Sequence, residues 1–234
     1  MKPEFVFYHI PKCGGTSIRV YLYNLLRNIY NVEEIYLPQN IVGKCEYAGI
    51  NLVSQSDYVS ALSILGERMD QMKVILCHIK NNNVLDITNK CKTITVLRHP
   101  VDRLISHYYY FDIEKFNNIP LRKLPGDTIL KYCDSYSSVM CDYILPGGSI
   151  NDVIKFYKTI DYKLILEHID TQLPDITKDI TNDLKINIPV DKIKPIDKLN
   201  KQTRKGTNRL ERRLISNLLQ GSMDMKLYNY AIEL

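Results

Sequence analysis

Hydrophobic and polar positions divide the chain into short continuous apolar runs and longer stretches with a helical period. An apolar run over residues 5–10, followed by an apolar stripe that opens at Ile18, predicts a strand, a tight loop and a helix. Aliphatic and β-branched runs over residues 73–79, 93–97 and 162–167 predict further strands that are covered on both faces, as in a parallel sheet. The pattern therefore predicts an α/β fold with a central parallel sheet of four to five strands flanked by helices.

The rest of the chain is predicted to be mostly helical. Pro and Gly break residues 112–160 into short helical patterns, which we interpret as a helical insertion beside the ligand cleft. A basic loop and helices are expected over about residues 195–234. Other expected elements are short strands near residues 34–37 and 46–50, and helices over 58–69 and 173–184. With 234 residues, the chain is expected to form a single domain, residues 1–234.

Composition narrows the class of protein without identifying it. Hydrophobic residues make up 45% of the chain and charged residues 24%, which is ordinary for a folded globular protein. The formal net charge of +5 suits a polyanionic ligand but is too small to predict nucleic-acid binding. No apolar stretch reaches the ~20 residues that span a bilayer and no signal-type segment opens the chain, so we expect a soluble, cytoplasmic protein.

The loop between the first strand and the first helix has the residues of an anion site. Gly14 and Gly15 allow a positive φ and a close approach to a ligand, while Thr16 and Ser17 offer hydroxyls at the helix start. Lys12 adds a positive charge. This is not a Walker A loop, because the lysine precedes the glycines instead of following them. The alternative is an ordinary turn between a strand and a helix.

Cysteine chemistry is expected to be minor. The six cysteines are scattered, without the spacings that bind a metal, so we expect free thiols and no metal site. Cys13 lies beside Lys12, and we therefore expect a depressed pKa for its thiol. A catalytic thiol is disfavoured because no partner base lies nearby in the sequence.

A second phosphate motif follows the strand at residues 93–97. Pro100 suits the first turn of a helix, which begins after Arg98 and carries Ser106 two turns down. Arg98 can make a bidentate contact to a phosphate, and Ser106 can add a hydroxyl to the same group. The structural alternative is an ion-paired arginine followed by an aromatic helix that buries Leu104, Ile105, Tyr108 and Phe111.

Together the two motifs resemble those of sulfotransferases that use 3′-phosphoadenosine 5′-phosphosulfate (PAPS). The matching strings are Pro-Lys-x-Gly-x-[Thr/Ser]-Ser, from Pro11, and Leu-Arg-x-Pro-x-x-Arg-x-x-Ser-x-Tyr-Tyr, from Leu97. The resemblance is closest to the carbohydrate branch, such as heparan sulfate 2-O-sulfotransferase. It implies a P-loop-like three-layer fold, PAPS as the donor and no metal. Gly15 departs from the pattern, because relatives often carry Ser or Thr there.

The resemblance also implies roles for individual residues. Lys12 and His78 are expected to be catalytic, with His78 as the general base at the end of its strand. Glu167 is a weak candidate for a structural or acceptor role, and a capped strand end is the favoured explanation of this residue. The expected cofactor-binding residues are Lys12, Cys13, Gly14, Gly15, Thr16, Ser17, Arg98, Ser106 and, in a late basic loop that would cover the 3′-phosphate, Arg204, Lys205, Gly206 and Thr207.

The sequence therefore predicts an enzyme that moves a sulfuryl group from PAPS to an acceptor hydroxyl, for example on a carbohydrate. A small metabolite, a lipid or a peptide tyrosine stays open as the acceptor. A nucleotide kinase or NTPase is one alternative, although its Mg²⁺ usually needs an Asp where this chain has Arg98. A non-catalytic nucleotide-binding module is the other. No nucleic acid or membrane partner is expected, and the oligomeric state is not predicted.

Overall fold

A computed structural model describes residues 3–31, 34–36, 72–77, 91–185 and 209–234. Several expected features lie outside these ranges. They are the strand near residues 46–50, the helix at 58–69, His78, and the basic loop with Arg204, Lys205, Gly206 and Thr207.

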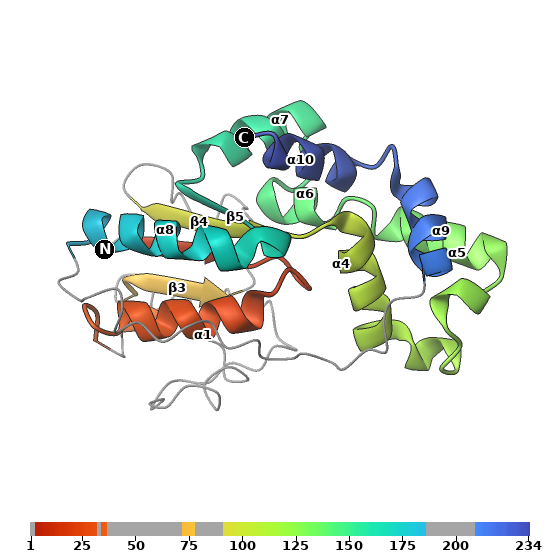
Figure 1. The fold of residues 1–234 in the computed structure, drawn as a ribbon, viewed down its shortest axis with the longest axis horizontal. Coiled ribbons are helices and arrows are strands. Elements are labelled where there is room, and N and C mark those ends of the chain that lie inside the picture. Colours follow the sequence, from red (N-terminus) through yellow and green to blue (C-terminus); the bar gives the residue numbers. More distant parts are fainter. Residues whose placement is uncertain (1–2, 32–33, 37–71, 78–90, 186–208) are drawn as a thin grey trace.

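In the described residues, five parallel strands form the central sheet, in the order β2-β3-β1-β4-β5. Figure 1 labels three of them, β3, β4 and β5. The first apolar run is the central strand, β1, which pairs with β3 on one side and β4 on the other. The strands are β1 (Phe5–Tyr8), β2 (Ile35–Tyr36), β3 (Val74–Cys77), β4 (Lys92–Leu97) and β5 (Tyr162–Ile165). This arrangement confirms the predicted α/β fold with a parallel sheet.

Helices make up most of the remaining described residues. They are α1 (Gly15–Leu26), α4 (Pro100–His107), α5 (Gly126–Ser135), α6 (Val139–Ile144), α7 (Ile150–Thr159), α8 (Ile169–Asp183), α9 (Arg209–Leu219) and α10 (Met223–Ile232). A π-helical segment, Tyr108–Asp112, continues α4, and single 3-10 turns lie at Glu114–Phe116, Leu121–Lys123 and Leu166–His168. Within the described ranges, none of the helices has the length and apolar character needed to cross a membrane.

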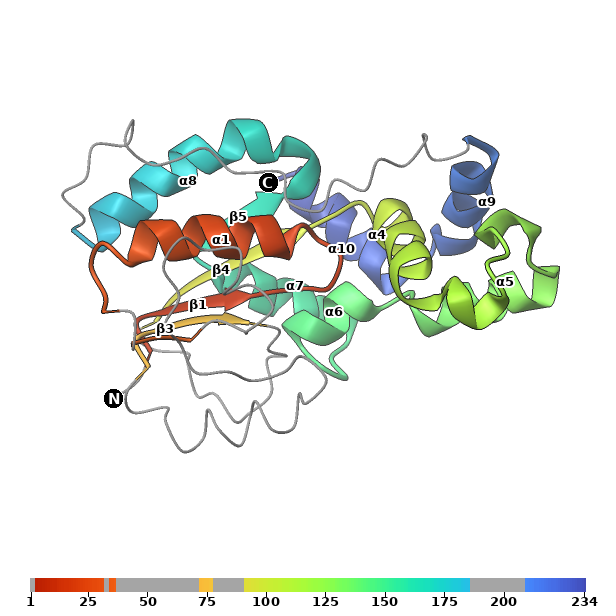
Figure 2. The ribbon, with the colours of Figure 1, turned by 90° about the horizontal axis from the view of Figure 1, so that it is seen from below.

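The sheet lies between two layers of helices. α1 and α8 cover one face, and α6, α7 and α10 cover the other (Figures 1 and 2). Phe5 and Phe7 of β1 pack with α1 and α8, whereas Val6 and Tyr8 pack with α6, α7 and α10. Because both faces of β1 are buried, its sequence is continuously apolar instead of alternating.

Beyond the carboxyl ends of the strands, α4, α5 and α9 form a third apolar cluster (Figure 2). Buried Glu211 of α9 joins the π-helical segment to the 3-10 turn at Leu121–Lys123, because its Oε1 accepts hydrogen bonds from the Tyr109 hydroxyl at 2.9 Å and the Arg122 backbone N–H at 3.1 Å. The helix that follows Arg98 shares the apolar cluster with α5 and α9.

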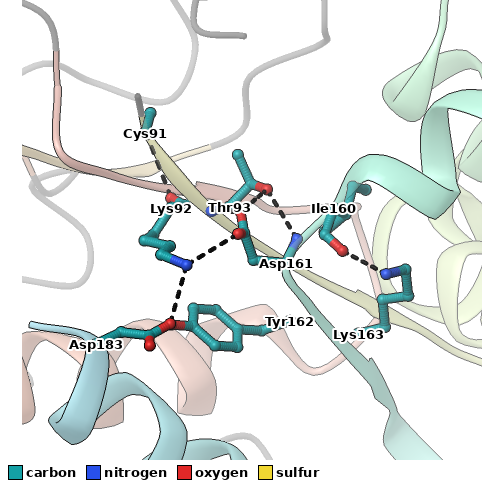
Figure 3. A network of polar contacts seen from close by, with 8 residues as sticks. All are labelled: Cys91, Lys92, Thr93, Ile160, Asp161, Tyr162, Lys163 and Asp183. Carbon is teal, nitrogen blue, oxygen red and sulfur yellow. Dashed lines mark hydrogen bonds and ion pairs between the residues drawn. The ribbon is translucent and has the colours of Figure 1, made fainter. Parts of the chain in front are cut away.

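A polar network ties the amino ends of β4 and β5 to the end of α8 (Figure 3). Asp161 accepts hydrogen bonds from the backbone N–H and the hydroxyl of Thr93, at 2.8 and 2.9 Å. Lys92 pairs with Asp161 at 3.3 Å and with Asp183 at 3.0 Å, and the Tyr162 hydroxyl donates to Asp183 at 2.6 Å. The network lies at the edge of the sheet opposite to the loop between β1 and α1, so it stabilises the sheet at a distance from that loop.

Candidate active site

The loop between β1 and α1 lies at the carboxyl edge of the sheet, where ligands bind in parallel α/β folds. Two of its residues have left-handed backbones, Lys12 at φ 67° and Gly14 at φ 77°. The Cys13 N–H donates to the Ile10 carbonyl at 3.3 Å, which closes the turn between them. The tight loop that the glycines predicted is therefore present, with a lysine as well as a glycine in the left-handed region.

Neighbouring side chains leave no room for a side chain at either glycine of the loop, Gly14 or Gly15. A Cβ at Gly14 would lie 2.5 Å from Cδ1 of Leu166, and a Cβ at Gly15 would lie 1.7 Å from Nε2 of His9. His9 is buried and stacks on Phe7, with ring centroids 5.5 Å apart. The His9 ring occupies the space that a side chain at position 15 would need, which explains why no hydroxyl occurs there.

The amino end of α1 has the properties of an anion site. Among the described residues no side chain caps it, its N-cap is Gly14, and its first turn carries no acidic residue. The first bond along the helix runs from the Ile18 N–H to the Gly14 carbonyl at 3.3 Å, so the earlier N–H groups face out of the helix start. The helix dipole and the charge of Lys12 favour a negatively charged ligand at this position.

The two sequence motifs meet at this edge. β4 pairs in parallel with β1 and ends at Leu97, which places Arg98 beside the loop. Nη1 of Arg98 donates to the carbonyl oxygen of Lys12 at 2.9 Å. The arginine of the second motif therefore contacts the backbone of the lysine of the first.

α4 begins at Pro100, as predicted, and Ser106 lies close to its end. The N-cap residue His99 donates its backbone N–H to Oε1 of Glu167 at 2.9 Å. The Tyr228 hydroxyl lies 3.3 Å from Oε2 of the same carboxylate. Glu167 therefore caps the start of α4 and joins it to α10, which supports its structural interpretation.

The ammonium group of Lys12 lies over an aromatic ring. Its Nζ is 3.4 Å from the ring centroid of Tyr110 and 5.4 Å from that of Phe111. Both rings belong to the π-helical segment and are about half exposed, at 53% and 49%. Leu104, Ile105 and Tyr108 are buried, but Phe111 is not, so an aromatic core helix accounts for only part of this sequence.

His107, the last residue of α4, is held by a cluster of polar side chains. Its Nδ1 is 3.2 Å from Oδ2 of Asp112 and 3.0 Å from the Tyr132 hydroxyl, which itself donates to Asp112 at 2.8 Å. Burial, and then the charge of Arg103, lower the pKa of His107 to about 4, and Lys12 adds to this effect. The imidazole is therefore neutral at neutral pH. His107 is not among the residues that the sequence motifs single out, because nothing in the sequence of α4 distinguishes it.

The pKa of Asp112 is lowered although its carboxylate is buried. Burial acts to raise the pKa of Asp112, but hydrogen bonds from Lys115 and Tyr132 outweigh it, and the pKa lies below its ordinary value. Asp112 is therefore an ionised carboxylate beside the His107 ring.

The expectation of a depressed pKa for the Cys13 thiol is wrong. The side chain is buried in the core beneath the loop, and burial raises its pKa to about 12 although Arg103 and Arg98 act in the other direction. Cys13 follows Lys12 in the sequence, but the sequence does not show that the thiol points into the core. Cys13 is therefore a protonated packing residue.

The structure brings most of the described candidate residues to one edge of the sheet. Lys12, Gly14, Gly15, Thr16 and Ser17 form the loop and the start of α1, with Arg98 in contact and Ser106 on the adjoining helix. β3, which precedes His78 in the sequence, ends beside β1 with Cys77 opposite Tyr8. Across the described ranges, no three His, Cys, Asp or Glu side chains gather in a way that suits a metal ion.

The sequence pattern that defines the sulfotransferase family matches residues 2–141. No curated protein matches the chain. Among solved structures, a sulfotransferase from Alicyclobacillus acidocaldarius is similar with 14% identity and a TM-score of 0.46, over 100% of this chain and 96% of that one. The family match covers both sequence motifs and the strands that carry them, and the chain therefore belongs to the sulfotransferase family.

Proposed function

We propose that this sulfotransferase uses PAPS as its donor and transfers the sulfuryl group to a hydroxyl of a carbohydrate-like acceptor. The observation that carries the proposal is the 2.9 Å bond from Arg98 to the Lys12 carbonyl, which puts a candidate 3′-phosphate residue beside a candidate 5′-phosphate loop. A nucleotide with phosphates at both ends of its ribose needs two such anion sites close together on one edge of the sheet.

The residues of this edge fit such a donor. Lys12 and the N–H groups at the start of α1 are suited to the 5′-phosphosulfate, because that helix end has no side-chain cap among the described residues and no acidic residue in its first turn. Arg98 and Ser106 are assigned to the 3′-phosphate. The loop with Arg204, Lys205, Gly206 and Thr207 is proposed to complete that site, on the basis of the sequence resemblance alone.

Each residue then has a separate task in the reaction. PAPS supplies a sulfuryl group on a good leaving phosphate. Lys12 stabilises the negative charge that develops at the leaving oxygen, together with the backbone N–H groups of α1. His78 is proposed to take the proton of the acceptor hydroxyl, if it lies within hydrogen-bond reach. Arg98 and Ser106 contribute orientation more than chemistry.

Calorimetry tests the donor. We expect 3′-phosphoadenosine 5′-phosphate to bind without added Mg²⁺ and ATP to bind much more weakly. A screen with labelled PAPS against glycans, small metabolites, lipids and tyrosine peptides then identifies the acceptor. Mg²⁺-dependent ATP turnover would instead support the kinase alternative, and donor binding without transfer to any acceptor would support the non-catalytic one.

Three variants test the residue roles. Lys12→Ala and His78→Ala should lower kcat by about 10²–10³-fold with little change in donor affinity. Arg98→Ala should weaken donor binding by about 10–100-fold, because it removes charge-assisted hydrogen bonds. Exposed Lys131 of α5 provides the control, and Lys131→Ala should change neither quantity. Equal losses of donor affinity in all three variants, with kcat unchanged, would contradict the assignment.

A further inference from the structure

The side chain of Lys12 has a defined position although its charged end is not buried. Its Nζ lies 3.4 Å from the ring centroid of Tyr110, well inside the range in which a cation is attracted by an aromatic face. A lysine side chain on a loop otherwise samples many rotamers, and each must be given up when the ammonium contacts a ligand. The contact with Tyr110 therefore restricts the group that the proposed reaction depends on.

The ring of Tyr110 is fixed by the segment that carries it. In this π-helical segment the Ile113 N–H donates to the Tyr108 carbonyl at 2.8 Å, across five residues. Tyr108 and Asp112 are buried, and Asp112 is bonded to Lys115 at 2.7 Å. Tyr110 lies between these two anchored residues, so its 53% exposed ring is presented to Lys12 from a rigid backbone.

The two ends of Lys12 are held by one continuous stretch of chain. Arg98, just before α4, donates to its carbonyl oxygen, and Tyr110, just after α4, lies beneath its ammonium group. Arg98 therefore supports the left-handed backbone at φ 67°, and Tyr110 sets the direction of the side chain. The exposed Tyr110 ring has no packing role in the core. Its observed contacts are with the Lys12 ammonium and, edge to face at 4.6 Å between centroids, with the neighbouring ring of Phe111.

We propose that Tyr110 is a positioning residue that holds the Lys12 ammonium over its ring, ready for the anionic group bound at the start of α1. The inference rests on the proposed function for the identity of that group, but the contact itself can be measured without it. The aromatic face is what the role requires. The hydroxyl of Tyr110 is not required.

Nuclear magnetic resonance of the free protein tests the contact. Protons above an aromatic face are shifted upfield, so the ε-methylene resonance of Lys12, assigned with Lys12→Arg, should lie upfield of the other lysines. Tyr110→Phe should keep this shift, and Tyr110→Leu should remove most of it, because only the Phe111 ring, at 5.4 Å from Nζ, remains nearby. The control is Tyr230→Leu, because Tyr230 has its own cation, Lys158, at 5.4 Å on the helix pair α7 and α10. It should leave the Lys12 resonance unchanged.

Kinetics with PAPS test the consequence. Tyr110→Leu should lower kcat by about 2–30-fold, the range expected from a cation–aromatic contact, while the KM for the donor stays within about twofold. Tyr110→Phe should retain wild-type kcat. Loss of the contact should also lower the unfolding midpoint slightly, so kcat is measured at a temperature where every variant is fully folded. A kcat loss that disappears under this condition would overturn the proposal.

The two proposals fail in different ways. If wild-type protein transfers no sulfuryl group but the full upfield shift of the Lys12 resonance is seen in wild type and Tyr110→Phe only, the proposed function fails and the positioning role of Tyr110 is supported. If sulfotransfer is found and the Lys12 resonance is ordinary in wild type, Tyr110 does not hold the ammonium. Equal kcat in wild type and Tyr110→Leu would also overturn the inference.

Discussion

At the scale of single residues, the ring of His9 explains why position 15 is a glycine. The ring of His9 is buried against Phe7 and occupies the place of a side chain at position 15. The sequence alone indicated only that a hydroxyl was missing there. The structure supplies the reason, and it makes the pair His9 and Gly15 a coupled unit of the loop.

The coupling predicts a rescue. Gly15→Ala should destabilise the protein by about 1–3 kcal/mol or more, because the added Cβ would overlap the His9 ring. In a His9→Ala background, Gly15→Ala should cost nothing or stabilise slightly, since alanine is the better helix former. Urea unfolding of the four proteins measures the coupling.

Gly126 is the matched control for this cycle. It is the first residue of α5, and a Cβ there would meet nothing within 4 Å. Gly126→Ala should therefore be neutral or stabilising, with or without His9→Ala. Additive effects of His9→Ala and Gly15→Ala would show that the two side chains do not compete for the same space.

At the scale of elements, α4 connects a buried carboxylate and a partly buried histidine that respond to pH in opposite directions. Arg103 of α4 lies 3.7 Å from Asp224 of α10, whose carboxylate accepts the backbone N–H groups of Met140 and Cys141 at the start of α6. Burial raises the pKa of Asp224 to about 6, although Arg103 acts to lower it. The pKa of His107, at the other end of α4, is lowered to about 4.

Whether a group adds or removes stability as the pH falls depends on whether the folded or the unfolded protein binds its proton first. As the pH falls from 6.5 to 5, the unfolded chain protonates His107 before the folded protein does, so this group removes stability. The folded protein protonates Asp224 before the unfolded chain does, so that group adds stability over the same range. Each contribution is on the order of 1–2 kcal/mol, and in the wild type they largely cancel.

Removing one group should reveal the other. His107→Gln should become more stable as the pH falls from 6.5 to 5, whereas Asp224→Asn should become less stable, from a lower starting value. Urea unfolding at several pH values in this window measures both slopes. Identical slopes in wild type and both variants would show that neither group titrates as described.

The sequence predicted the positions of the strands and of the start of α4, but not every local backbone conformation. Pro100 predicted the start of α4, and the apolar runs predicted each described strand within a few residues, because proline and continuous burial act locally. The π-helical turn at Tyr108 was not predictable, since no residue type encodes it. Neither was the burial of the Cys13 thiol nor the left-handed backbone of Lys12, because both depend on Arg98 and on helices distant in the sequence.

At the scale of the whole molecule, the parallel sheet separates stability from function. All five strands point the same way, so the network around Asp161 lies at one edge and the candidate site at the other. His78 and the loop from Arg204 to Thr207 remain sequence-based assignments. The sequence predicted this overall plan well, because a parallel sheet places every strand end that carries a ligand residue on one side.

Because the Asp161 network and the candidate site lie at opposite edges of the sheet, a substitution in the network should change stability and leave nucleotide affinity unchanged. Asp161→Ala removes two hydrogen bonds to Thr93 and the contact with Lys92, and should destabilise the protein by about 1–2 kcal/mol. The unfolding midpoint should fall by about 2–8 °C. The affinity for 3′-phosphoadenosine 5′-phosphate should stay within twofold, as measured by calorimetry on the folded protein.

Asp134 of α5 is the control, because it is exposed and its carboxylate is not in the Asp161 network. Asp134→Ala should change neither the midpoint nor the affinity. A loss of nucleotide affinity in Asp161→Ala, at a temperature where the variant is fully folded, would mean that the two edges of the sheet are coupled.

The left-handed backbone of Lys12, at φ 67°, limits which residues can replace the lysine at this position. Glycine and asparagine adopt such a backbone readily, whereas branched side chains resist it, so the position filters substitutions by shape before chemistry is tested. Replacing Lys12 by glycine would delete the ammonium and relax the main chain together, while replacement by alanine would delete it and keep the main chain strained. Comparing the two replacements separates the charge that the loop presents from the conformation in which it is presented.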